Sequence, residues 1–135
     1  MYTEATAKAR YLRMSARKVR LIADLVRGKQ VDEALSILRH TPKGAAEPVR
    51  DVVRSAAANA MSSVGSARLK VEDLTIEKIF VDGGPSYKRI RAASMGRAVR
   101  IKHRLCHITV VVAGEAREER RRRRSKAKEA VEEEE

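Results

Sequence analysis

The chain has 135 residues and a mass of 15.1 kDa, a length that fits one folded domain with a core of its own. It carries 30 Lys and Arg against 18 Asp and Glu, and the formal net charge of +12 indicates a polyanionic partner. No run of residues is long and apolar enough to span a membrane, and a single cysteine, Cys106, excludes an intramolecular disulfide. We therefore expect a cytoplasmic protein with no membrane partner.

The positive charge is concentrated in two parts of the chain. Residues 1–29 have eight basic and two acidic side chains, and residues 83–114 have seven basic side chains and no acid. Residues 30–82 are nearly balanced, and residues 115–135 have eight side chains of each sign. This distribution predicts two basic arms on a charge-balanced scaffold.

The first elements are a strand and an amphipathic helix. Residues 5–14 can form the strand, Ser15 can cap the helix, and Gly28 is placed to end it. Its apolar residues follow the i, i+3, i+4, i+7 spacing, and two further leucines are expected to widen the stripe. They are Val19, Ile22, Ala23 and Val26, with Leu21 and Leu25.

Two more helices follow. A short one is predicted to start with Asp32 as its N-cap and to end at Thr41-Pro42. The next runs from about Ala45 to about Val64, and its apolar face has the most regular periodicity in the chain. That face consists of Val49, Val52, Val53, Ala56, Ala60 and Val64.

The rest of the scaffold is predicted to be a pair of strands. Apolar residues alternate over 74–81 and change parity near Lys78, which predicts a face switch or a bulge there. A second strand covers residues 99–112, and residues 86–98 between the two offer little to a core.

The expected fold is α+β: three helices packed on a small antiparallel sheet, with a long protruding β-hairpin at about 83–104. One domain should span residues 1–114, followed by a charged, disordered tail over 115–135 that includes five consecutive arginines. The expected core is Val19, Ile22, Val26, Leu35, Leu38, Val49, Val52, Val53, Ala56, Ala60, Ile76, Phe80, Ile108 and Val110.

The bases of the two arms are the candidate nucleic-acid contacts. On a strand, alternate residues share one face about 6.6 Å apart, close to the spacing of phosphates. At the start of the first helix, basic side chains oppose the helix dipole, and a bound phosphate would reverse that penalty. Charge protection of an edge strand and ordinary surface charge are the plain alternatives. The candidates are Lys8, Arg10, Arg13, Arg17, Lys18, Arg20, Lys88, Arg89, Arg91, Arg97, Arg100, Lys102 and Arg104.

Other chemistries are not supported by the sequence. Strand alternation places His103 and His107 on one face and Cys106 on the other, so these residues cannot assemble a zinc site locally. The basic arms hold no carboxylate to orient a histidine, and no phosphate-binding glycine loop is present. We expect no enzyme activity, metal, cofactor or small-molecule substrate. Four scattered aromatic residues cannot form the usual base-stacking platform, so recognition should rest on phosphate, 2′-hydroxyl and shape.

Several motifs occur together and in a fixed order. They are Arg13-Met14-Ser15-Ala16-Arg17-Lys18-Val19-Arg20, Ser55-Ala56-Ala57-Ala58-Asn59-Ala60, Val81-Asp82-Gly83-Gly84-Pro85, Gly96-Arg97-Ala98 and His107-Ile108-Thr109-Val110-Val111-Val112. Over about residues 5–114 the chain resembles the family of bacterial large-subunit ribosomal protein twenty-two.

This resemblance implies a structural protein of the large ribosomal subunit. Its expected partners are the large-subunit ribosomal RNA, neighbouring ribosomal proteins and, near the hairpin tip, the nascent peptide. The resemblance also implies that the hairpin lines the peptide exit tunnel, close to where macrolide antibiotics bind. Carried over by position, the arms are 84–90 and 96–104, and the tip is Arg91, Ala92, Ala93, Ser94 and Met95, where the family commonly has a proline and two bases.

A DNA-architectural protein with basic β-arms is the alternative interpretation, and an RNA-processing enzyme is a third. Architectural arms kink DNA with an apolar wedge, often a proline, at the tip. Here Pro85 lies at the base of the arm instead.

Overall fold

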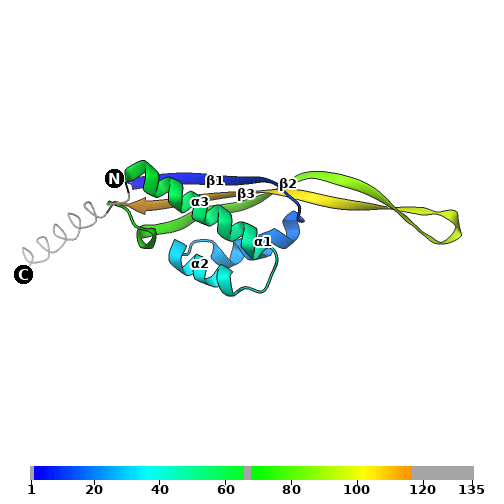
Figure 1. Ribbon diagram of the computed structural model, residues 1–135, viewed down its shortest axis with the longest axis horizontal. Coiled ribbons are helices and arrows are strands. Elements are labelled where there is room, and N and C mark those ends of the chain that lie inside the picture. The colour runs from blue at the N-terminus through cyan, green and yellow to red at the C-terminus, as the bar shows by residue number, and fades with distance from the viewer. Residues whose placement is uncertain (1, 66–67, 117–135) are drawn as a thin grey trace, which may run out of the picture.

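The computed structural model describes residues 2–65 and 68–116. In chain order the elements are β1 (Tyr2–Leu12), α1 (Ala16–Val26), α2 (Val31–His40), α3 (Ala46–Val64), a short 3-10 turn at Val71–Asp73, β2 (Leu74–Ala92), a second such turn at Ser94–Gly96, and β3 (Ala98–Glu115). The strands form one antiparallel sheet in the order β1-β3-β2. The helices lie against one half of the sheet, and the outer halves of β2 and β3 extend beyond them as a hairpin (Figure 1). The predicted α+β class is confirmed.

The central strand, β3, runs the length of the molecule without an extra residue. Its neighbours bulge around it: β1 between Ala9 and Leu12, and β2 between Ile76 and Lys78 and again between Gly83 and Ser86. The first of the two β2 bulges is the one predicted near Lys78. Each bulge reverses which side chains of its own strand face the helices, while β3 keeps a single alternation throughout.

The core lies between the helices and the inner face of the sheet. Val19, Val53 and Ile108 have no exposed surface, and Leu35 packs against the core while remaining half-buried. Phe80, expected in the core, is 45% exposed because the bulge after Ile76 turns it to the outer face. The predicted widening of the α1 stripe is also wrong. Leu21 and Leu25, the two leucines expected to widen the stripe, are 60% and 48% exposed.

Most of the predicted helix ends are confirmed. Ser15 occupies the predicted N-cap position of α1, although its side chain makes no capping hydrogen bond, and Gly28 has a φ of 76° just past the C-cap, a conformation that glycine adopts readily. α3 ends at Gly65, with a φ of 96°. The start of α2 differs, since Gln30 occupies the N-cap position and Asp32 lies in the first turn, where its charge still favours the helix dipole.

The hairpin strands stay paired as far as Ala92 and Ala98, and Ala93–Arg97 make the turn. The turn therefore starts two residues later than the expected tip, and Arg91 belongs to the arm, opposite Val99. At the other end of β3, Glu115 pairs with Tyr2 and is part of the sheet. The remainder of the predicted tail, residues 117–135, lies outside the described residues. Within the described part of the chain, no helix is long and apolar enough to cross a membrane.

Candidate nucleic-acid interface

The helix-facing side of β3 changes from apolar to basic where the helices end. Residues 112, 110, 108 and 106 face the helices and are fully buried. The same alternation then continues with Arg104, Lys102 and Arg100, the three bases expected to share a face. Lys88 lies opposite Lys102 across the hairpin. The outer side of the hairpin carries Arg89 and Arg91, and the turn carries Arg97. All seven of these basic residues are exposed.

The predicted amino-terminal bases lie on β1, on α1 and, for Arg13, on the segment between them. Lys8 and Arg10 are exposed on β1, and Arg17 and Lys18 are exposed at the start of α1, whose first turn has no acidic residue. Arg20 makes two hydrogen bonds within the fold that the sequence does not reveal. Its Nε and Nη2 donate to the carbonyl oxygen of Val81 at 3.1 and 3.0 Å, which ties α1 to β2.

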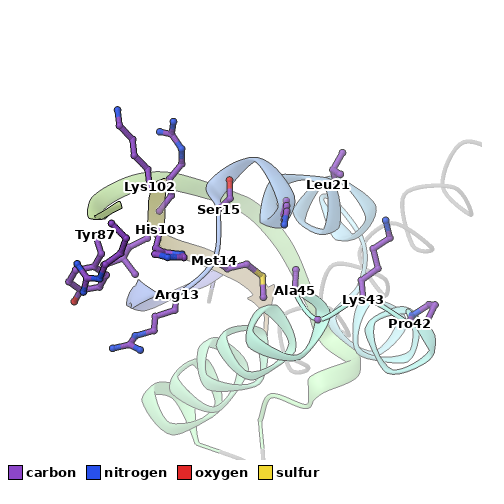
Figure 2. Close-up of a pocket in the computed structure, with 15 residues that line it drawn as sticks. Arg13, Met14, Ser15, Leu21, Pro42, Lys43, Ala45, Tyr87, Lys102 and His103 are labelled. Atoms are coloured by element: carbon purple, nitrogen blue, oxygen red, sulfur yellow. The ribbon is translucent and has the colours of Figure 1, made fainter. Parts of the chain in front are cut away.

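A groove of about 1370 Å³ brings parts of both basic arms together at the base of the hairpin. Among the described residues that line it, none is acidic. In Figure 2, Tyr87 and Lys102 lie at one end of the groove, Pro42 and Lys43 lie at the other, and Met14 lies between them. The basic side chains of the lining are Arg13, Lys18, Lys43, Arg89, Lys102 and Arg104. An open, acid-free groove of this kind attracts an extended polyanion.

Two guanidinium groups of the groove approach one aromatic ring. The Cζ of Arg13 lies 5.9 Å from the centroid of the Tyr87 ring, and the Cζ of Arg89 lies 5.7 Å from it. Both distances are in the range of a cation–π contact. Arg13 comes from the segment between β1 and α1, and Arg89 comes from the hairpin, so Tyr87 joins the two predicted basic sets.

On β3, His107 and Cys106 are used for positioning and packing, whereas His103 is exposed and lines the groove. The backbone N–H of Tyr11, at a φ of 57°, donates to Nδ1 of His107 at 3.0 Å, and the two rings meet edge to face. His107 therefore fixes the β1 bulge at the base of the hairpin. Burial raises the pKa of the Cys106 thiol, an effect that the charge of Arg20 partly opposes. Across residues 2–65 and 68–116, no group of three or more His, Cys, Asp or Glu side chains could hold a metal ion.

Sequence reasoning missed Lys43 and Tyr87 as parts of the groove. Lys43 lies in the nearly neutral middle of the chain, so only the packing of the loop between α2 and α3 brings it to the basic arms. For Tyr87, the available signal was a tyrosine directly before Lys88 and Arg89 in the basic arm.

A comparison with family models relates this chain to a family of ribosomal proteins. The model described as ribosomal protein L22p/L17e matches residues 7–113, which is most of the chain and includes every basic residue of the groove and of the hairpin. The match extends over all three helices and the whole hairpin, so it concerns the fold and the candidate interface together. The chain therefore belongs to the ribosomal protein L22p/L17e family.

Proposed function

We propose that this protein binds large-subunit ribosomal RNA through the basic groove and the hairpin, and that the hairpin reaches the peptide exit tunnel. As a member of its family, the protein is a structural constituent of the large ribosomal subunit, in the cytoplasm. The proposal concerns what its surfaces do there.

The observation that carries RNA binding is the acid-free basic surface that begins in the groove and continues along the hairpin. Arg100, Lys102 and Arg104 repeat about every 6.6 Å on one face of β3. Phosphate contacts of this kind fix the position and orientation of a protein on a nucleic acid without reading its sequence. All thirteen predicted bases are exposed, and within the described residues Arg20 alone among them is tied to a distant element by two hydrogen bonds.

The shape of the hairpin supports a role at a distance from the globular part. Ile90 and Met95 are 77% and 92% exposed, so the outer part of the hairpin buries no apolar cluster of its own. A narrow two-stranded ribbon can enter a channel in RNA that the helical part cannot. We infer that the turn at Ala93–Arg97 borders the exit tunnel and contacts the nascent peptide, and that neighbouring ribosomal proteins contact the globular part.

A DNA-architectural role is less well supported by the geometry. Pro85 lies within the bulge at the base of the hairpin, far along the strand from the turn, so the turn at Ala93–Arg97 has no proline to act as a wedge. The family match also concerns a ribosomal protein, over residues 7–113.

The test of RNA binding is the salt dependence of affinity. The full chain is titrated onto a deproteinised large-subunit rRNA transcript over a series of KCl concentrations. We expect log affinity to fall linearly and steeply with log salt, because each neutralised phosphate releases a counterion. Replacing Arg100, Lys102 and Arg104 together by Gln should make the slope shallower, by about one for each phosphate that the variant no longer neutralises.

The matched control replaces Arg39, Arg54 and Lys78 by Gln, which removes the same number of positive charges from exposed residues that do not line the groove, and it should leave the slope unchanged. Flat salt dependence of the unmodified chain would contradict the proposed function.

A further inference from the structure

Tyr87 occupies an unusual electrostatic position. Two like-charged guanidinium groups, those of Arg13 and Arg89, each lie within 6 Å of its ring centroid. In the described part of the chain neither group is paired with a carboxylate, although Arg89 donates one hydrogen bond to the carbonyl oxygen of Lys88. The negative face of an aromatic ring attracts each cation but does not neutralise either.

The backbone brings these groups together by two bulges at the same level of the sheet. The β2 bulge between Gly83 and Ser86 reverses the alternation, so that Tyr87 and Arg89 lie on the outer face of the hairpin. On the other side of β3, the β1 bulge contains Tyr11, whose φ is 57°. The N–H of Met14 then donates to the carbonyl of Leu12 at 2.8 Å, which closes a tight turn around Arg13. Arg13 is therefore presented by a constrained backbone.

Tyr87 is 47% exposed, and its hydroxyl has no hydrogen-bond partner among residues 2–65 and 68–116. The cluster thus has two planar donors, one ring that orients them, and no internal anion. Guanidinium groups match the oxygens of phosphate with paired N–H donors, and two of them held on one ring are preorganised for such a ligand.

We propose that Arg13 and Arg89 clamp a backbone phosphate of the RNA at the base of the hairpin, and that Tyr87 is the positioning residue that holds both guanidinium groups in place. The inference rests on the proposed function, because it assumes that RNA lies in the groove. It adds one specific contact point to an otherwise extended surface. It also assigns a role to Tyr87 that is separate from base stacking, since cations rather than a base occupy the approaches to its ring.

The test compares Tyr87→Leu with Tyr87→Phe on the same deproteinised rRNA transcript and KCl series. Phe keeps the ring and removes only the hydroxyl, so Tyr87→Phe should bind like the unmodified chain. Tyr87→Leu removes the ring, and we expect about three- to tenfold weaker binding and a salt slope shallower by about one. Tyr87 is half exposed on a hairpin that adds nothing to the core, so both variants should fold, and circular dichroism checks this.

A double-mutant cycle tests the positioning role. If Tyr87 acts through the two arginines, the effect of Tyr87→Leu should largely disappear when Arg13 and Arg89 are already Gln. Additive effects would overturn the proposal. A loss of affinity at an unchanged salt slope would also overturn it, because that result indicates stacking on a base. So would an equal loss in Tyr87→Phe, which would assign the effect to the hydroxyl.

These outcomes are distinguishable from a failure of the proposed function. If RNA binding itself is wrong, the unmodified chain shows a flat salt dependence, and replacing Arg100, Lys102 and Arg104 has no effect. If only the clamp is wrong, that triple replacement still reduces the slope, while Tyr87→Leu leaves it unchanged.

Discussion

Val53 illustrates how much a single core side chain contributes to the stability of this fold. It lies on α3 with no exposed surface. Val53→Ala should lower the free energy of unfolding by about 1–3 kcal/mol, through reduced apolar burial and the small cavity that remains. Leu21→Ala is the control on α1, because Leu21 is 60% exposed, and its cost should stay below about 1 kcal/mol. Urea unfolding measures both, and equal costs would show that Val53 is not in the core.

Cys106 should make stability depend on pH at the alkaline end. Its folded pKa is raised, mainly by burial, above the value of about 8.5 expected in the unfolded chain. The thiol is protonated in both states below that value, so its contribution is fully present there. As pH rises further, the unfolded thiol ionises first, and stability is lost until the pH passes the folded pKa, at no more than about 1.4 kcal/mol per pH unit.

The measurement is urea unfolding of the unmodified chain and of Cys106→Ala at several pH values above neutrality. The alanine adds a constant cost from its cavity, so the difference between the two proteins should shrink as pH rises. Parallel curves would show that the thiol does not titrate differently in the folded state.

At the scale of elements, the hairpin and the scaffold should be separable. No residue between Tyr87 and His103 belongs to the buried core. Ser86 pairs with Arg104, so residues 87–103 can be replaced by Asn-Gly, which suits a two-residue turn between paired strands. The melting temperature should change by less than about 4 °C, because little apolar burial is removed. A larger fall would mean that the hairpin stabilises the scaffold.

Periodicity was enough to predict the helices and the strands, because each depends on a local spacing of apolar residues, and the hairpin was predicted because residues 86–98 offer little to a core. The change of parity near Lys78 even located the first β2 bulge. Phe80 was nevertheless predicted to lie in the core. The change of alternation shows that the strand reverses its two faces, but not which residues then face the helices. The groove could not be predicted, because Arg13, Lys43 and Tyr87 come to line one groove only through tertiary packing.

At the scale of the whole molecule, the hairpin turn should act on the tunnel without anchoring the protein. Ala92, Ala93 and Ser94 offer little to hold phosphate, whereas the arms and the groove carry the bases. Deleting Ala92–Met95 leaves a three-residue loop between the paired residues Arg91 and Val99. In cells, we expect the shortened protein to enter large subunits normally, and macrolide sensitivity or stalling on arrest peptides to change.

Sucrose gradients measure incorporation, and the unmodified chain, expressed in the same way, is the control. If incorporation were lost with the tip deletion alone, the tip would be an assembly anchor. If incorporation, drug response and stalling were all unchanged, the tunnel role would be excluded.

The regular pairing of the hairpin has a consequence for how its length can change in evolution. Beyond Ser86 and Arg104 the two arms are paired without a bulge as far as Ala92 and Ala98. Inserting two residues in each arm would lengthen the hairpin by about 7 Å and return every side chain to its original face. A single residue in each arm would exchange the two faces and move the basic row away from its side of the sheet. Length variants that keep the same RNA-facing side should therefore differ by even numbers of residues per arm.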